Sequence, residues 1–558
     1  MTKYVESVEA RYKRYQTAKS DLDEMRALLN DAYFYSAPYR NDFFVQTQGT
    51  DEMVDVFDNT AVDGVVKYAS TIQSIIMPAS RRFVNLIPGN ELKKVFKEDD
   101  DSLNEIKEKL QEATETLFTN LNNSNFYRVV NEALQDMCIS TGVIMINEGT
   151  PDQPFIFSSV PLSKVYFGCN ASKEIVDFYR DWNIKGRLIK EQWQNAVLPE
   201  SLESKIKNSP DEEVALIESF IEYPFNSPEY RYYYCVMTEK KEEIFNQFMS
   251  YQKFIAFRSN VSSHSNYGIG EIIRLLPTIR FLNRLLEDGV AIVDWKAFPA
   301  WMLTSSAIIN PYSISVGSNQ VFYVRNEPGD AIKLLQPNNN GSDQVFVEWV
   351  QSSRQTIKDT LFLSPFNEPV QSAVQSATEV QIRYENWIRS SGAQAGRLSD
   401  ELVKPIIKVC VQILKKLGVL KDLETSLGFI EMKINNTEIA IDYASPLLAI
   451  QSQEDITNLN AYMQNWAGLY GVEFLYMMMN IELIPQWMAE KQNVPLSFIK
   501  STPIIKNGIA QLLGMAKASL NNAQAPGGGG QQAAPQQLLV PGQSGGQSQQ
   551  QGSPALLT

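Results

Sequence analysis

The stretch from Tyr267 to Gly418 constrains the fold of this chain more than any other part of the sequence. It opens with apolar residues at three- and four-residue steps, which is the period of one face of an α-helix. Short extended runs follow from Phe298 to Asn340, and helical spacing then resumes until just before Pro365. This order predicts two helices that bracket a small α/β knob. The first helical face consists of Ile272, Leu275, Leu276, Ile279, Leu282, Leu285, Leu286 and Val290.

A polar loop and a long third helix complete the stretch. The loop covers residues 364–377, and Glu368 is its only charged residue. Thr378 is a suitable N-cap for the helix that follows. The helical pattern continues to Gly418, although glycine and proline interrupt it. Kinks are expected at these interruptions, which are Gly392, Gly396 and Pro405.

The residues before this stretch predict helices and then a strand-rich region. Strand-like runs begin at Val143 and reach Arg258, with one short helix expected over residues 189–197, so we expect an α+β unit. The earlier helices are expected over residues 4–37, 60–77, 103–121 and 126–139.

The residues after the stretch predict a hairpin, several helices and a disordered tail. The hairpin pairs residues 429–434 with 438–443 about the turn Asn435-Asn436. The last segment, residues 521–558, has no charged residue and is rich in Gln, Gly, Pro, Ser and Ala, so it is expected to be disordered. Helices are expected over residues 453–466, 472–480, 484–492 and 503–520.

Composition restricts the function further. The 558 residues carry a net charge of −14, which argues against a protein that grips nucleic acid through a broad basic surface. Two readings of the acidity stay open. It suits a passage through which DNA slides without sticking, because phosphates near a negative wall gain no counterion-release affinity, and it equally suits a protein kept soluble by charge. No run of about 18 apolar residues occurs, and the start is unlike a signal peptide, so a soluble intracellular protein without a membrane span is expected.

Neither the cysteines nor the single histidine predict a site. The cysteines are far apart and lack the paired spacing that holds zinc, so reduced and mostly buried thiols are expected. His264 lies in a serine-rich run without a second catalytic cluster, and we interpret it as a loop residue. The cysteines are Cys138, Cys169, Cys235 and Cys410.

Enzyme signatures are largely absent. The sequence has no Gly-x-x-x-x-Gly-Lys phosphate loop and no His-Glu-x-x-His pair. The acidic run Glu98–Asp101 leaves a metal-dependent nuclease as an alternative, although it also suits a solvated helix start. We therefore expect no enzyme activity, no catalytic residue, no cofactor and no metal site.

Several short segments, none diagnostic alone, occur in a characteristic order over roughly 450 residues. They are Val56–Ala61, Ile76–Phe83, Ser124–Tyr127, Ser140–Val143, Tyr267–Gly270, Ala377–Val380 and Ile441–Pro446. In their order and spacing the chain resembles the head-to-tail connecting (portal) protein family of short-tailed double-stranded DNA phages, the podoviruses. The resemblance fades after about Pro446.

The resemblance implies an α+β fold, mainly α. It would be a portal-type subunit with an α/β wing, a two-helix stem, a small α/β clip and a helical crown, and it would assemble into a ring. The implied segments are the N-terminal part of the wing over residues 1–266, the stem helices over 267–297 and 345–363, the clip over 298–344, the channel (tunnel) loop over 364–377, a long kinked helix with a wing return hairpin over 378–443, the crown over 444–520 and the disordered tail over 521–558.

The resemblance also implies a function. The chain would be the phage portal, a ring at one capsid vertex through which the terminase motor packages double-stranded DNA and through which the DNA is later ejected. Implied partners are further copies of the chain, with twelve expected, the major capsid protein, the terminase large subunit, the tail adaptor, and internal core or scaffolding proteins. DNA would pass without sequence specificity. The ring would be assembled in the host cytoplasm and reside at the head–tail junction of the virion. The alternative is another virion assembly protein, such as a tail-tube or internal core component.

Within such a ring, two sets of residues are candidates for the channel. Arg354 and Lys358, four residues apart on the second stem helix, would form two stacked positive rings if they face inward, and otherwise lie on a solvated outer face. The channel loop would meet phosphates through short polar side chains, or else be an ordinary surface loop. Its candidate residues are Ser364, Pro365, Phe366, Asn367, Glu368, Gln371, Ser372, Gln375 and Ser376.

The clip supplies a third set, expected to contact the packaging motor and later the tail adaptor. Aromatic side chains are enriched at protein interfaces, although some of these must form the core of the knob instead. The clip interface candidates are Trp301, Tyr312, Phe322, Tyr323 and Arg325.

Overall fold

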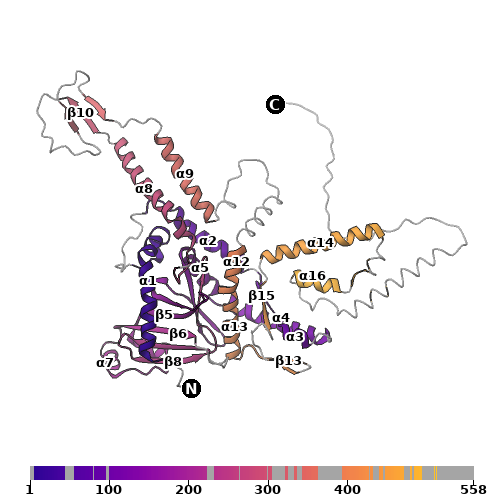
Figure 1. The fold of residues 1–558 in the computed structure, drawn as a ribbon. Coiled ribbons are helices and arrows are strands. Elements are labelled where there is room, and N and C mark those ends of the chain that lie inside the picture. Colours follow the sequence, from indigo (N-terminus) through magenta and orange to yellow (C-terminus); the bar gives the residue numbers. More distant parts are fainter. Residues whose placement is uncertain are drawn as a thin grey trace, which may run out of the picture. The chain divides into compact units, whose positions relative to one another are not determined.

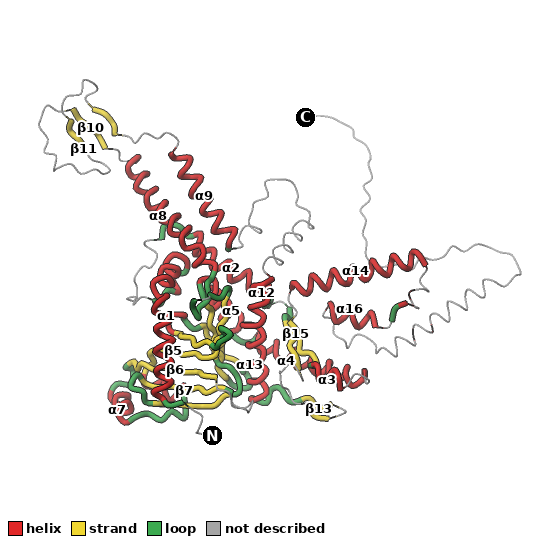
Figure 2. The backbone as a smooth tube through the Cα atoms, in the orientation of Figure 1, coloured by secondary structure: helices red, strands yellow, loops and turns green. Residues whose placement is uncertain are grey.

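The structure is a computed structural model of the chain, drawn in Figures 1 and 2. It divides into two compact units, Met1–Met463 and Gln464–Thr558. The residues that it describes are 6–43, 56–79, 81–95, 100–222, 231–262, 264–297, 300–304, 321–324, 332–335, 342–361, 392–425, 428–430, 439–443, 446–470, 475, 478–480, 483–492, 508 and 511.

The N-terminal region is helical where the sequence predicts helices. Ser7 caps the first helix by accepting a hydrogen bond from Ala10 N at 3.3 Å. At the start of the second, Asp58 Oδ1 accepts one from Thr60 N at 2.9 Å. Such caps satisfy N–H groups that have no partner within a helix. The helices are α1 (Val8–Ser36), α2 (Thr60–Ile76), α3 (Asn90–Val95), α4 (Asp100–Asn122) and α5 (Phe126–Ile139), with a 3₁₀ turn at Pro38–Arg40.

Two antiparallel sheets follow. One has the strand order β4-β5-β6-β7-β8 and the other the order β3-β2-β9. Figure 1 shows α1 running along the larger sheet, which its tyrosine and arginine side chains contact. The strands are β2 (Thr141–Glu148), β3 (Phe155–Ser159), β4 (Val165–Cys169), β5 (Ile175–Lys185), β6 (Glu213–Glu222), β7 (Tyr232–Thr238), β8 (Glu243–Met249) and β9 (Phe254–Arg258), and short 3₁₀ turns lie at Leu162–Lys164 and Gly186–Leu188.

The helix predicted over residues 189–197 is shorter than expected. The structure has α6 (Ile189–Gln192), and the chain then leaves the helix so that Val197 N donates to Ile244 O of β8 at 2.8 Å. A second helix, α7 (Glu200–Asn208), begins directly after Pro199. Proline lacks an N–H and is therefore tolerated at a helix start and not in its interior, which explains why helix resumes only there.

The main core of the N-terminal region lies where α5 packs on β2 and β3 and against α2. Phe126 is fully buried, and its ring centroid lies 5.2 Å from that of Phe157. Gly142 on β2 permits close contact, because a Cβ there would lie 2.4 Å from Ala133 O of α5. A glycine is therefore required at this point of the Ser140–Val143 segment.

The C-terminal strands pair differently from the prediction. The hairpin predicted about Asn435-Asn436 is wrong in its pairing. Strand β15 (Ile439–Tyr443) pairs antiparallel with β1 (Val84–Pro88), and β14 (Gly428–Ile430) pairs with β13 (Leu423–Thr425). Leu86 lies opposite Ile441 and is 4% exposed, so the long-range pairing buries apolar side chains that a local hairpin would not reach. Residues 431–438 lie outside the described part.

Two long helices follow the N-terminal region, namely α8 (Glu271–Ala297) and α9 (Ser342–Thr360). Figures 1 and 2 show them side by side. Pro277 lies inside α8, in its second turn. Between the helices, β10 (Ala300–Thr304) pairs parallel with β11 (Val321–Val324) and antiparallel with β12 (Ile332–Leu335).

The long third helix is irregular where the sequence predicts an interruption. Its described part consists of α12 (Gly392–Leu398), a π-helical segment (Ser399–Val403) and α13 (Lys404–Lys416). Pro405 has no N–H to donate to the carbonyl four residues earlier, and its ring would clash with that carbonyl. The π-helical turn just before Pro405 avoids the clash.

The C-terminal part contains α14 (Pro446–Tyr470) and α16 (Ile484–Gln492). The helices predicted over residues 472–480 and 503–520 fall mostly outside the described part, and the predicted tail, 521–558, falls entirely outside it. In the portion of the chain that the structure describes, none of the helices has both the length and the hydropathy of a membrane span. The α+β class with helix predominating is confirmed.

Candidate functional site

We call α8 and α9 together the hairpin. The first half of α8 is buried against α1 and α5, whereas its second half leaves this core and contacts α9. Gly289 allows the two helices to come close, because a Cβ there would lie 2.6 Å from the Phe346 ring. Ile357 near the C-terminal end of α9 and Leu361, the residue after the helix, are both 0% exposed. The base of the hairpin is therefore held firmly by apolar packing.

An ion pair also fixes the base. Arg354 on α9 donates from Nε to Asp58 Oδ2 at 2.7 Å, and its Nη2 lies 2.7 Å from the same oxygen. The Asp58 side chain is 6% exposed and the Arg354 side chain 42%. Just before α2, Phe57 N donates to Asn283 Oδ1 of α8 at 2.8 Å. The segment before α2 therefore ties both helices of the hairpin to the N-terminal region.

The two predicted channel cations differ in their surroundings. Arg354 is bound to Asp58, whereas Lys358, four residues later, is exposed on α9. A charge that is neutralised by a nearby carboxylate contributes less to the field of a channel than a free one. Of the two candidates, Lys358 is the one whose charge the neighbouring described residues leave unneutralised.

The predicted channel loop, residues 364–377, lies outside the described residues, and we call the nearest described parts before and after it, Leu361 and α12, its anchors. The preceding anchor is Leu361, buried at the end of α9. The following anchor is α12, where Gln394 Nε2 donates to Glu271 Oε1 at 3.0 Å and to Ser259 Oγ at 3.2 Å. Leu361 is thus buried in the core, and α12 contacts the first residue of α8.

The π-helical segment carries the strongest polar contact of the second anchor. Glu401 accepts hydrogen bonds from Arg258 N at 2.9 Å and from Arg258 Nη2 at 3.0 Å. The Arg258 side chain is 4% exposed and the Glu401 side chain 23%. A charge-assisted contact in such a poorly solvated position is stronger than one at the surface. The irregular turn before Pro405 is thereby locked onto the end of β9.

The clip candidates are only partly described. Trp301 lies on β10, and Phe322 and Tyr323 lie on the neighbouring strand β11, where Phe322 is opposite Met302. Tyr312 and Arg325 lie outside the described residues. The sheet brings the first three candidates together on adjacent strands, and their role at an interface stays a prediction.

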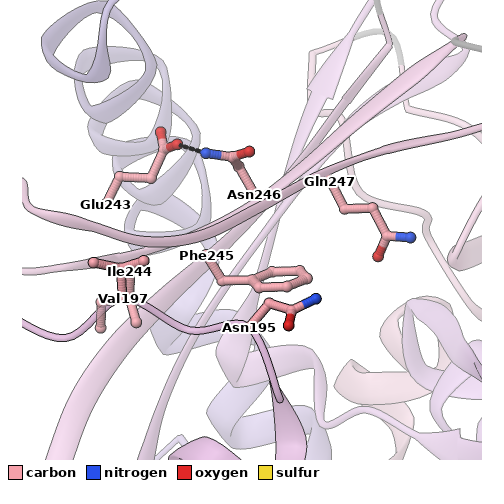
Figure 3. A pocket seen from close by; sticks show the side chains of 7 residues that line it. All are labelled: Asn195, Val197, Glu243, Ile244, Phe245, Asn246 and Gln247. Carbon is pink, nitrogen blue, oxygen red and sulfur yellow. Dashed lines mark hydrogen bonds between the residues drawn. The ribbon is translucent and has the colours of Figure 1, made fainter.

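A pocket of about 410 Å³ lies at the edge of the large sheet, along β8 (Figure 3). Its one acidic residue, Glu243, is already engaged: it accepts hydrogen bonds from Arg11 Nη2 at 2.5 Å, Tyr233 OH at 3.1 Å and Asn246 Nδ2 at 2.5 Å. The rest of the lining is amide and apolar. The pocket therefore lacks a free general base or nucleophile. Its lining residues are Asn195, Val197, Glu243, Ile244, Phe245, Asn246 and Gln247.

The cysteines are free thiols, as predicted, and three of them are buried. Burial raises the pKa of Cys235 to about 12, although Arg11 opposes the shift. Burial also raises the pKa of Cys138 and of Cys410. The thiolate is the reactive form of cysteine, so these thiols are poor nucleophiles. His264 is exposed in its loop, and within the described residues no three His, Cys, Asp or Glu side chains gather as a metal site would require.

Sequence reasoning missed the contacts that hold the site together. The Arg354–Asp58 and Arg258–Glu401 pairs join residues far apart in the chain, and no local pattern encodes such a pairing. One local signal was available: an Asp two residues before the predicted helix start at Thr60 is a capping residue. It would have identified Asp58 as a residue at a helix terminus, though neither its burial nor its partner.

Comparisons with known proteins give the following matches. A virion of a native gene transfer agent particle is similar at a TM-score of 0.35 and 11% identity, covering 76% of this chain and 95% of that chain. The neck of an empty gene transfer agent particle is similar at a TM-score of 0.36 and 11% identity, covering 74% and 91%. Likeness at this level carries no argument about function. No curated protein matches.

The comparison with protein families is decisive. The sequence model of the bacteriophage head to tail connecting protein family matches residues 9–499, which include the hairpin, both anchors of the loop and the two sheets. Members of that family are structural proteins of the phage particle. The chain belongs to the bacteriophage head-to-tail connecting protein family.

Proposed function

We propose that the chain is the portal of a short-tailed phage. It forms a ring of twelve copies at one capsid vertex, and double-stranded DNA passes through the ring during packaging and again during ejection. The observation that carries the proposal is the family match over residues 9–499. A protein that connects a head to a tail lies between the two, where we expect the genome to leave the head.

The hairpin supports the assignment of the stem. It consists of two long helices whose base is fixed by Arg354, Asp58 and Asn283. In this proposal α8 and α9 are the stem, and the clip covers residues 298–344, of which the last three begin α9. The wing covers residues 1–266 and the return over 378–443, and the crown covers 444–520.

Electrostatics support passage of DNA without tight binding. The net charge is −14, so phosphates gain little counterion-release affinity from the surface as a whole. A sparse set of positive side chains repeated around a ring then guides the DNA without trapping it. Lys358 is the favoured candidate for such a ring, and the channel loop over residues 364–377 supplies polar contacts that do not read sequence.

The clip and wing would contact the other virion proteins. The clip, with Trp301, Phe322 and Tyr323 on adjacent strands, would bind the terminase large subunit during packaging and the tail adaptor afterwards. The wing and crown would contact the major capsid protein and internal core or scaffolding proteins. Assembly would take place in the host cytoplasm. No catalytic step is assigned to the chain.

The decisive test is the symmetry and mass of the purified full-length chain. We expect electron microscopy to give top views with twelvefold symmetry and a central hole, and light scattering to give the mass of about twelve copies. A chain that remains a monomer under every assembly condition, including added scaffolding protein, would overturn the portal assignment. That result would favour the alternative function, a tail-tube or internal core component.

A further inference from the structure

The hairpin exposes an unusual share of large apolar side chains. Among the described residues eighteen such side chains are exposed, and seven of them lie on α8 and α9. Six others are spread singly over the N-terminal region, as is normal for a soluble protein, and the remaining five lie on α14 and the residues after it. A cluster of exposed apolar residues marks an interaction surface. The hairpin members are Phe281 (48%), Val290 (52%), Ile292 (42%), Val293 (63%), Val345 (43%), Val347 (50%) and Trp349 (52%).

These side chains lie on two opposite sides of the hairpin. Phe281 and Val290 are nine residues apart on α8, and at about 100° per residue this separation places them half a turn apart. Val347 and Trp349 are two residues apart on α9, which places them about 200° apart. Phe281 and Trp349 contact each other, with ring centroids 6.1 Å apart. The hairpin therefore has one side marked by this aromatic pair and an opposite side marked by Val290 and Val347.

We call these the aromatic side and the aliphatic side. The contact between the helices runs between the two sides, through Gly289 and Phe346. Charged side chains are mixed along the hairpin, with exposed Arg284, Asp288 and Lys358 among them, so neither side forms a block of one charge. Two packed helices with exposed apolar side chains on two opposite sides are expected to contact a neighbouring protein surface on each side, because exposed apolar surface favours burial.

A second copy of the chain is the one partner that covers both sides. A two-fold dimer would join like sides and leave the other side of every copy in water. A head-to-tail contact joins unlike sides, and each copy then uses both. We infer that the aromatic side of the hairpin of one copy packs on the aliphatic side of the hairpin of the next copy. The inference rests on the proposed ring and specifies which surfaces hold the ring together.

The test uses two full-length variants, each with one side disrupted. One carries Phe281→Ser and Trp349→Ser, and the other carries Val290→Asp and Val347→Asp. Each variant alone is expected to lose rings, with the apparent association constant reduced about tenfold or more, as for loss of central apolar contacts. A mixture of the two variants should form heterodimers and no rings, because only one intact aromatic side and one intact aliphatic side remain to meet.

Matched controls separate assembly from folding. Val197→Ser changes a side chain that is 75% exposed on the N-terminal region, and rings should persist. A variant with Trp349→Phe keeps an aromatic ring at this position. It should retain most of the assembly that a variant with Trp349→Ser loses. Circular dichroism and thermal unfolding should show that every variant folds.

Each outcome decides the inference. Rings formed normally by folded variants of both kinds would overturn the inference and leave the proposed portal intact, which would mean that another protein covers these sides. Dimers formed by either variant alone would also overturn it, because they would show contact between like sides. A wild-type chain that forms no ring would overturn the proposed function and the inference with it.

Discussion

The N-terminal body, by which we mean residues 6–262, and the hairpin differ in how far they bury their aromatic side chains. In the body, Phe126 and Phe157 are 0% and 1% exposed and contact each other within the same chain. In the hairpin, Phe281 and Trp349 also contact each other, yet they are 48% and 52% exposed. The body is complete as one copy, whereas the hairpin has apolar surface that a single chain does not cover.

Ion pairs in the body and in the hairpin also differ in how deeply they are buried. The body pairs deeply buried charges, as in Arg40 with Asp136, whose side chains are 18% and 3% exposed. At the hairpin base, Arg354 is 42% exposed even though its partner Asp58 is buried. We conclude that the buried contacts of one copy lie mainly in the body, and the proposed ring would add further contacts to the hairpin.

The largest expected effect comes from truncating a matched pair of phenylalanines. Phe126→Ala should lower the free energy of unfolding by about 3–5 kcal/mol, because it opens a cavity in the core. Phe281→Ala should lower it by less than about 1 kcal/mol in the monomer, since this side chain is half exposed, yet it should impair assembly. Urea unfolding of monomeric chain and light scattering of the assembled chain measure the two effects. Equal losses of monomer stability would contradict the division between body and hairpin.

The next largest effect on the free energy of unfolding is expected from replacing a buried arginine, compared with replacing an exposed one. Arg40 donates to both oxygens of Asp136, at 3.0 and 2.5 Å, and Tyr33 OH donates to Oδ1 at 3.0 Å. Arg40→Ala leaves this carboxylate buried without its cation, which should cost about 3–5 kcal/mol of unfolding free energy. Arg82→Ala removes a surface pair with Glu115, in which both side chains are exposed, and should cost at most about 1 kcal/mol. Similar losses for both would mean that Asp136 is better solvated than its burial indicates.

The sequence predicted the elements of both regions better than their contacts. Periodicity located α5 and α16 to the residue and α8 and α9 within a few residues, because one face of each is consistently apolar. It did not pair β15 with β1, which lie over 350 residues apart, because a strand pattern encodes burial and not the identity of a distant partner. For the site, it selected Arg354 as a cation but could not reveal its pairing with Asp58.

The third expected effect is a pH dependence within the body. Burial raises the pKa of Asp177 to about 6, because desolvation outweighs the attraction of Arg14. Between the ordinary value of 3.8 and about 6, the folded chain holds this proton more tightly than the unfolded chain. Stability contributed by this group is therefore greatest at low pH, falls as the pH rises through that window, and is constant above it.

The comparison of wild type with Asp177→Asn isolates this group. Asparagine does not titrate, so the difference in unfolding free energy between the two proteins should change by about 2 kcal/mol from pH 4 to pH 6. Urea unfolding at several pH values measures it. A difference that stays constant, or one that grows in favour of the wild type as the pH rises, would show that the ion pair with Arg14 dominates over burial.

The smallest expected effect separates the two channel cations. Arg354→Ala should lower the free energy of unfolding by about 1–2 kcal/mol, because it leaves the buried Asp58 with fewer hydrogen bonds. Lys358→Ala should change it by less than about 0.5 kcal/mol, since Lys358 is exposed. Urea unfolding of each variant measures both values, and an equal loss would contradict the assignment of Arg354 as an anchor. The same two variants can be compared in an assay of DNA packaging. A packaging defect in Lys358→Ala without loss of stability would arise from the channel. The same defect in Arg354→Ala could also result from the loss of its contact with Asp58.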